Sequence, residues 1–200
     1  MNDSRQKKTI LLVTAAAGVF ADNGYTATRM ADVAQAAGIG KGTIYEYFRS
    51  KEDLFFAVFQ WLALDTGRQA TLAIREMTGP VSRRLEQIND TIINKWLDQL
   101  NYYSLMLEFW SAASAPSMRH RFKQAFQNAY REFRPIIAAL LRDGIRRGEF
   151  SEKVDAEAVA ATLLGAWDAL LLQAWFDPEF DALTTSRHFL KVLIAGLNNV

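Results

Sequence analysis

The chain has 200 residues, of which 50% are hydrophobic and 22% are charged, a composition typical of a folded globular protein and not of a disordered one. Twenty-three basic side chains against 22 acidic ones leave a net charge of +1, so any binding to nucleic acid must come from a local patch. The absence of cysteine excludes disulfides, thiolate metal sites and cysteine nucleophiles.

Apolar residues recur at helical spacing along most of the chain, and glycines and prolines separate these runs. The spacing predicts an all-α fold. A first helix is expected over about 4–22, ending at Asn23-Gly24. Thr28 is expected to cap a short helix that ends at Gly38, and a second short helix should follow over about 41–48. Ser50 should start a long helix, and later helices are expected over about 81–100, 102–114, 117–147 (kinked at Pro135), 155–176 and 184–198.

No segment resembles a membrane span. The most apolar stretch, residues 163–176, has 14 residues and contains Asp168 and Gln173, whereas a span needs roughly 20 apolar residues. The N-terminus has basic residues before an apolar run, as in a signal peptide, but its apolar residues follow helical spacing and no cleavage site comes after them. We expect a cytoplasmic protein that does not contact a membrane.

Two short helices joined by a glycine turn predict a helix-turn-helix over about 29–48, although this spacing alone leaves a simple packing role open. In the second helix Ile44 and Phe48 share one side and must face inward. A glycine on the opposite side, Gly42, would let the backbone approach a surface closely. Five more side chains lie on this outer side or at its edges and could contact phosphates and bases. They are Lys41, Thr43, Tyr45, Glu46 and Tyr47.

The run from Thr28 to Leu54, TRMADVAQAAGIGKGTIYEYFRSKEDL, resembles the DNA-binding module of TetR-family transcriptional regulators. The pattern of that family is T-x-x-x-IA-x-x-AGVS-x-G-x-[IL]-Y-x-[HY]-F-x-SKE-x-L. The match departs from it at Gly40, where the family usually has serine, and in having four residues, not three, between Thr28 and Val33. The resemblance implies a helix-turn-helix DNA-binding domain over residues 5–65 and a helical ligand-binding and dimerisation domain over 66–200.

The resemblance also implies roles for single residues. Thr28 would bind a phosphate at a helix N-terminus, and Lys41, Gly42 and Thr43 would enter the major groove. Tyr45, Tyr47 and Lys51 would also contact phosphates of the DNA backbone. Further phosphate contacts, without sequence specificity, could come from Arg5, Lys7 and Lys8. Glu46 would accept a hydrogen bond from cytosine or point away from the DNA.

The aromatic side chains beyond residue 66 either fill a core or line a cavity. The resemblance implies a chamber for a small-molecule effector, for which we expect Met106, Trp110 and Tyr130 as wall residues. Glu108 and Asp168 are single carboxylates in apolar stretches. Each would bind a cationic ligand, or lie on a partly exposed face or in a salt bridge with one of Arg119, Arg121, Arg131 or Arg134, and we favour the second interpretation.

The last two expected helices are candidates for a dimer interface, although they could instead close the core of their own subunit. Small residues and a leucine stripe suggest close helix packing, and the resemblance implies a four-helix bundle about a two-fold axis. The residues expected in the interface are Ala161, Gly165, Ala169, Leu190, Leu193 and Leu197.

These features together predict a homodimeric, ligand-responsive transcriptional regulator. We expect a repressor without a cofactor, released from a near-palindromic double-stranded DNA operator by a small apolar or amphipathic molecule. One alternative is a nucleoid-associated or cell-division scaffold that binds DNA without an inducer. A second is an all-α enzyme, which is disfavoured because the chain lacks H-E-x-x-H, a phosphate loop and G-x-S-x-G.

Overall fold

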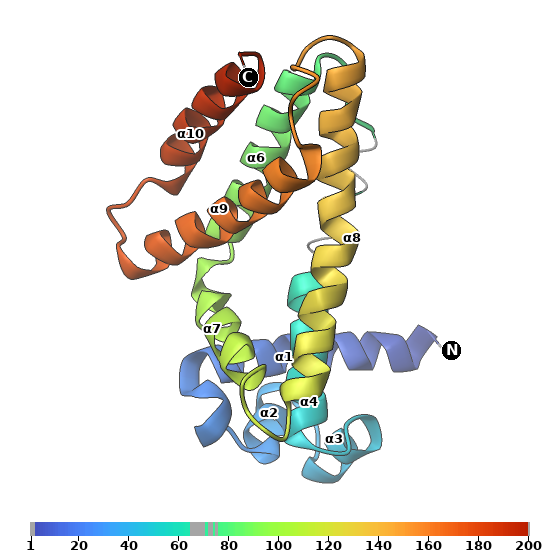
Figure 1. Cartoon of the computed structure of the whole chain (residues 1–200). Coiled ribbons are helices and arrows are strands. Elements are labelled where there is room, and N and C mark those ends of the chain that lie inside the picture. The colour runs from blue at the N-terminus through green and yellow to red at the C-terminus, as the bar shows by residue number, and fades with distance from the viewer. Residues whose placement is uncertain (1–2, 65–70, 72–73, 75, 200) are drawn as a thin grey trace. The chain divides into compact units, whose positions relative to one another are not determined.

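The computed structural model describes residues 3–64, 71, 74 and 76–199, and the regular structure of these residues is helical, without strands (Figure 1). The all-α prediction is confirmed. The α-helices are α1 (Asp3–Ala27), α2 (Met30–Ala36), α3 (Lys41–Tyr47), α4 (Lys51–Phe59), α6 (Val81–Leu97), α7 (Tyr103–Ala112), α8 (Arg119–Arg146), α9 (Ala156–Phe176) and α10 (Ala182–Leu197). A π-helical turn, η1 (Gln60–Leu64), follows α4, and a 3₁₀ turn, η2 (Leu100–Tyr102), precedes α7.

The chain forms two compact units. The first contains Met1–Thr66 and Asn101–Gln127, and the second contains Gly67–Leu100 and Asn128–Val200. These packing units do not follow the domain division expected from sequence, because residues 101–127 pack with the N-terminal helices. The expected boundary at residues 65–66 itself falls at the edge of a segment, 65–70, that lies outside the described residues.

An aromatic core holds the first unit together. Phe55 of α4 lies 5.2 Å from Phe20 of α1 and 4.8 Å from Phe109 of α7, measured between ring centroids. Phe122, in the first turns of α8, lies 5.5 Å from Phe59, and all five rings are buried. Large rings bury much apolar area and hold each other at defined angles, so α7 and the start of α8 are fixed against α1 and α4.

The helices near the N-terminus follow the predicted pattern with two corrections. Gly24 adopts φ 76° and ψ 158° and interrupts α1, where Asn23-Gly24 was expected to end it, and three more helical residues follow. The N-cap of α2 is Arg29, not Thr28 as we expected, and its N–H donates to the Asp32 carboxylate at 2.8 Å. The expected cap of α4 is confirmed, since the Ser50 hydroxyl accepts from the Asp53 N–H at 3.0 Å.

A buried polar chain connects three helices of the second unit. The indole N–H of Trp167 on α9 donates to the Asn89 side chain on α6 at 2.9 Å. The Asn89 amide in turn donates to the Ser186 hydroxyl on α10 at 2.9 Å. Because buried polar groups are costly unless they are paired, this chain fixes the register of α6, α9 and α10.

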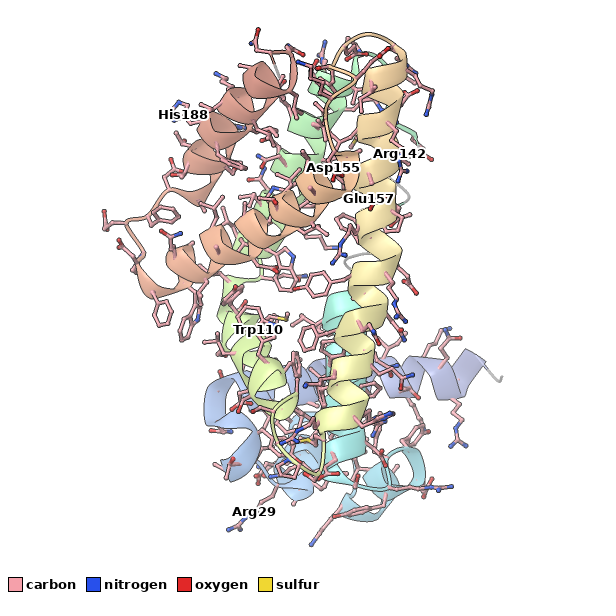
Figure 2. All side chains as sticks on the ribbon, in the orientation of Figure 1. Arg29, Trp110, Arg142, Asp155, Glu157 and His188 are labelled. Atoms are coloured by element: carbon pink, nitrogen blue, oxygen red, sulfur yellow. The ribbon has the colours of Figure 1, made fainter. Side chains whose placement is uncertain are left out.

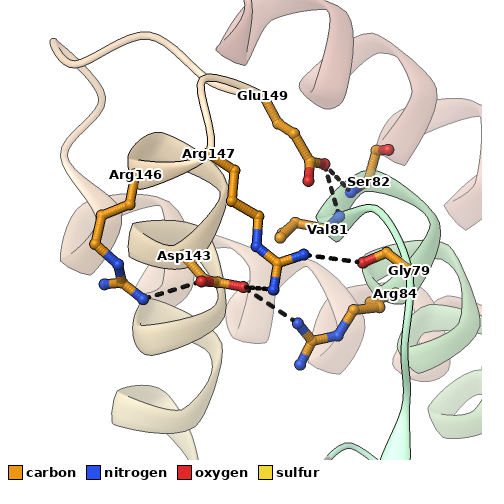
Figure 3. A network of polar contacts seen from close by, with 8 residues as sticks. All are labelled: Gly79, Val81, Ser82, Arg84, Asp143, Arg146, Arg147 and Glu149. Atoms are coloured by element: carbon orange, nitrogen blue, oxygen red, sulfur yellow. Dashed lines mark hydrogen bonds and ion pairs between the residues drawn. The ribbon is translucent and has the colours of Figure 1, made fainter.

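The end of α8 contacts the start of α6 through a group of charged residues (Figure 3). The Asp143 carboxylate forms ion pairs with Arg84 at 3.4 Å, Arg146 at 3.0 Å and Arg147 at 2.9 Å. Glu149 accepts from the Val81 N–H at 2.6 Å and thereby caps α6, whose first residues provide no side-chain cap.

The long helices have nearly the predicted bounds, and α8 continues through Pro135. Two helices among the described residues, Ser4–Ala27 and Ala156–Phe176, are long and apolar enough to cross a membrane. This corrects our expectation that no segment has that length and composition. Core helices of soluble proteins meet the same criteria, and Phe20 and Trp167 give both helices a buried side, so the finding is weak support for a membrane role.

Candidate nucleic-acid interface

Helix α3 presents the side that the sequence predicts. Ile44 is buried, whereas Lys41, Gly42 and Glu46 are exposed, and 48% of Tyr45 is exposed. Phe48, at the end of the helix, is buried as expected. The helix therefore has an inner side that anchors it and an outer side available to a partner. The individual DNA contacts stay predictions.

Gly40 is the N-cap of α3 and provides no side-chain hydrogen bond to the first turn. Serine and threonine satisfy one of the free N–H groups at this position in other helices. The serine that the family usually has at this position would provide such a hydroxyl, and Gly40 does not. The free N–H groups of this turn are left to solvent or to an anionic partner.

Arg5 joins the start of α1 to the end of α3. Its guanidinium donates to the Glu46 carbonyl at 3.1 Å and lies 5.3 Å from the centre of the Tyr47 ring. A cation is favoured at the C-terminal carbonyls of a helix. The sequence predicted only a phosphate contact for Arg5, because nothing local shows that a residue 41 positions away lies beside it.

The structure corrects the role expected for Thr28. Only 1% of this residue is exposed, and its hydroxyl donates to the Gly24 carbonyl at 2.8 Å. The hydroxyl therefore closes the interrupted end of α1 and does not face a phosphate.

Lys51 is corrected in the same way. Its ammonium donates to the carbonyls of Tyr25 at 2.7 Å, Thr26 at 3.1 Å and Thr28 at 2.9 Å. It also lies 4.5 Å from the centre of the Tyr25 ring. An ammonium has three donors, and all three are used within the protein. Lys51 thus joins α4 to the end of α1 instead of holding a phosphate.

Glu108 is partly exposed, as the favoured interpretation allowed, but none of the ion pairs among the described residues joins it to the four arginines proposed as partners. Its half-buried carboxylate accepts from the Tyr25 N–H, with oxygens at 2.9 and 3.0 Å. Of the arginines proposed as partners, Arg119 donates to the Ser114 carbonyl at 2.8 Å. Arg121 pairs with Asp53 at 2.8 Å, and that hydrogen-bonded guanidinium lowers the pKa of Asp53.

The three expected effector contacts lie in different units. Met106 and Trp110 are half-buried on α7 in the first unit, and Figure 2 labels Trp110 on that helix. Tyr130 is on α8 in the second unit, where its hydroxyl donates to the Asp168 carboxylate at 3.0 Å. Burial raises the pKa of Asp168. Burial and the nearby Asp168 charge raise the pKa of Tyr130 to about 12.

The last two helices divide the expected interface residues into two groups. Ala161, Gly165 and Ala169 are exposed on α9. By contrast, Leu190 and Leu197 are buried and Leu193 is half-buried. The expectation that Leu190 and Leu197 form the dimer interface is therefore corrected, because these side chains close the core of their own subunit. The large hydrophobic residues exposed on α10 are Phe189 and Val192.

Metal ligation finds no support in the part of the chain that the structure describes. No group of three or more His, Asp or Glu side chains in it is arranged to hold a metal ion. Both histidines, His120 and His188, are exposed, and His188 points away from α10 (Figure 2).

Comparisons with known proteins agree with this arrangement. Residues 12–58 match the model of bacterial regulatory proteins of the tetR family, and residues 81–197 match that of the BetI-type transcriptional repressor C-terminal region. The chain is 25% identical to a fatty acid metabolism regulator protein of Bacillus subtilis (strain 168) over 98% of both chains. It is 30% identical to the uncharacterized HTH-type transcriptional regulator YhgD of the same organism, over 94% of this chain and 95% of that one.

A solved structure shares the fold. The crystal structure of the transcriptional regulator FadR from Bacillus subtilis in complex with stearoyl-CoA superposes with a TM-score of 0.76 at 22% identity, over 94% of this chain and 98% of that chain. The motif on α2 and α3, the exposed outer side of α3 and the two family matches lead to one conclusion: the chain belongs to the TetR family of DNA-binding transcriptional regulators.

Proposed function

We propose that the chain is a homodimeric repressor that leaves a near-palindromic operator when it binds a long-chain acyl-CoA. The observation that carries this proposal is the full-length similarity to a fatty acid metabolism regulator, together with the shared fold of a regulator that holds stearoyl-CoA. Such a molecule has an apolar tail and an anionic head, which fits the amphipathic effector that the sequence predicts.

The apolar tail would contact α7. Met106 and Trp110 are one helical turn apart and share a side of that helix, and both are half-buried. A flexible thioether beside an aromatic ring adapts to an alkyl chain at little cost. We therefore keep both residues as proposed contacts for the tail.

Helix α8 is rich in cationic side chains. Between Arg119 and Arg146 this helix contains seven arginines and lysines against two acidic residues, Glu132 and Asp143, although the whole chain carries only +1. Arg131 and Arg134 are exposed beside Tyr130, and neither forms an ion pair with a carboxylate in the described residues. Arginine matches phosphate geometry well, so these two side chains of the second unit are proposed contacts for a ligand that carries phosphate.

The dimer would form through the exposed sides of α9 and α10. Ala161, Gly165 and Ala169 allow close approach of another helix, and Phe189 and Val192 offer apolar area. A two-fold axis through this surface would make the contact self-complementary. The two copies of α3 would then enter successive major grooves about 34–36 Å apart.

The DNA contacts follow the exposed side of α3. Lys41, Gly42 and Thr43 would lie in the major groove, with the Lys41 ammonium able to reach guanine O6 and N7. Tyr45 and Tyr47 would donate to phosphates on the groove walls. Glu46 would accept from cytosine N4 where the operator offers it.

Fluorescence anisotropy tests the proposal. Labelled DNA from the region upstream of the gene is compared with scrambled DNA over a salt series, with and without stearoyl-CoA, coenzyme A or stearate. We expect the upstream fragment to bind about 10³-fold more tightly or better, and stearoyl-CoA alone to release it. Lys41→Met should abolish the preference, whereas the control Lys123→Met, at an exposed lysine of α8, should retain it.

The possible outcomes test operator binding and effector release separately. Specific binding that stearoyl-CoA leaves unchanged would reject the effector class and keep the operator-binding regulator. Equal binding to both DNAs that weakens with salt would leave only the electrostatic contribution. That result would favour the scaffold alternative.

A further inference from the structure

We propose that Glu108 is a positioning residue that couples α7, the proposed effector-binding helix, to the reading head, by which we mean α2 and α3. The inference rests on the proposed function, because it concerns how an effector on α7 changes DNA binding. It is independent of which molecule that effector is. The contact that carries it lies entirely within the first compact unit.

The contact is built around a break in α1. Gly24 leaves helical geometry, so the N–H of Tyr25 begins a new turn and lacks the usual partner within the helix. Both carboxylate oxygens of Glu108 take that N–H, at 2.9 and 3.0 Å. A Cβ at Gly24 would lie 3.1 Å from the carboxylate, so glycine provides both the backbone conformation and the close approach.

The other end of the same turn is held by an opposite charge. Lys51 donates to the carbonyls of Tyr25, Thr26 and Thr28. A carboxylate at the N–H end and an ammonium at the carbonyl end both complement the peptide dipoles of the turn. Thr28 directly precedes the N-cap of α2, and Lys51 is the first residue of α4. The turn therefore holds the two chain segments that flank α2 and α3.

Glu108 also lies on the correct side of α7 for coupling. At about 100° per residue, Met106 and Trp110 are about 40° apart, and Glu108 is about 160–200° from both. The proposed ligand contacts and the carboxylate therefore occupy opposite sides of one helix. A shift of α7 that accommodates a ligand on one side moves the carboxylate on the other relative to the Tyr25 N–H.

The carboxylate has no competing role in the described residues. None of their ion pairs involves Glu108, and Arg121, one of the arginines considered as its partner, is paired with Asp53. A half-buried carboxylate without a cation is costly unless it is hydrogen-bonded, and the Tyr25 N–H provides that bond. The position of α7 and the position of this turn are thus linked.

The variant Glu108→Gln keeps the shape and one acceptor oxygen but removes the charge, and Glu108→Asp keeps the charge but shortens the reach. Glu132→Gln, at an exposed position of α8, is the matched control. In the anisotropy assay the ratio of operator Kd with and without stearoyl-CoA should be about 5-fold or more in wild type and in the control. It should fall toward 1 in both Glu108 variants.

A second measurement needs no effector, because coupling between two sites is reciprocal. DNA binding should slow the hydrogen exchange of backbone amides in a peptide that covers α7, in wild type and in Glu132→Gln. In the Glu108 variants DNA should leave this exchange unchanged. Thermal unfolding confirms that each variant is folded. The inference would be overturned if DNA slowed exchange on α7 equally in wild type and in both Glu108 variants. It would also be overturned if DNA slowed exchange in none of these proteins. A wild-type operator complex that ignores stearoyl-CoA would reject the proposed effector, while the exchange comparison still decides the role of Glu108.

Discussion

Single polar side chains, and not only apolar burial, determine how the first unit is connected. Lys51, Arg5 and Glu108 each bond to backbone groups far away in sequence. Two of these three were expected to meet a ligand or DNA directly. A lysine beside a binding helix looks the same in sequence whether it holds a phosphate or three carbonyls, because its partners come from residues 23–26 positions away.

This assignment of Lys51 predicts a loss of stability and not a loss of a phosphate contact. Lys51→Met keeps most of the aliphatic stem and leaves three carbonyls without their charged donor, so the free energy of unfolding should fall by about 1–3 kcal/mol. Urea denaturation measures that loss. In DNA titrations the dependence of log K on log salt should stay as in wild type. A slope reduced by about 1 with unchanged stability would instead restore a phosphate contact.

Asp90 predicts a pH dependence in the second unit. The Arg187 guanidinium, which donates to both carboxylate oxygens at 2.7 and 2.9 Å, lowers the pKa of Asp90. Because the native pKa lies below the unfolded value of about 3.9, the pair stabilises the fold above that pH and loses its effect as the pH falls through the native pKa. Asp90→Asn should therefore destabilise at neutral pH, by a small amount because both side chains are partly exposed.

Urea denaturation between neutral and acidic pH tests this assignment. The difference in unfolding free energy between wild type and Asp90→Asn should shrink on acidification. Glu86→Gln, at an exposed carboxyl on the same helix, provides the reference, because Glu86 forms no ion pair within the part of the chain that the structure describes. A difference that stays constant down to acidic pH would show that the ion pair does not cause it.

Helices were predictable in this chain to the extent that their signals are local. The bounds of α6, α7, α8 and α9 lie within about three residues of the predicted ones, because apolar spacing and Gly or Pro at the ends are properties of the segment itself. The outer side of α3 was predictable for the same reason. Which side of α10 is buried was not, because its apolar residues cover more than one side and only the contacts with α6 and α9 decide between them.

Two apolar residues of α10 that are two positions apart, Leu190 and Val192, should therefore differ in their effects on stability and on dimerisation. Leu190 is fully buried and Val192 is 73% exposed. Leu190→Ala should cost about 2–5 kcal/mol of unfolding free energy and leave the dimer intact, provided that the subunit still folds. Val192→Asp should place a charge in the proposed interface and give monomers. Sedimentation equilibrium and thermal unfolding of both variants measure the two effects.

The reverse pattern would contradict this division of α10. If Leu190→Ala were monomeric at unchanged stability and Val192→Asp stayed dimeric, the leucine stripe would be the interface, as the sequence suggested. Protein concentration must be matched in the comparison, because dissociation of a dimer lowers apparent stability by mass action.

The chain carries a net charge of only +1, which limits how tightly one subunit can bind DNA. The electrostatic contribution grows with the number of phosphates neutralised, and here Lys51 is used internally while Arg5 also contacts α3. Few phosphate contacts per subunit remain. Operator binding by this protein should therefore depend on two subunits acting together, which the proposed dimer provides.

That dependence predicts sensitivity to the spacing of the operator. Insertion of about 5 base pairs between the half-sites turns one of them to the opposite face of the duplex, so wild-type affinity should fall to that of a DNA with a single half-site. The monomeric Val192→Asp variant should bind the original and the expanded operator equally, and no better than wild type binds the single half-site. Anisotropy titrations of the two proteins against the three DNAs give the comparison. Wild-type affinity that ignores the insertion would mean that each subunit binds DNA by itself, and the two-fold arrangement would then have no role in choosing the operator.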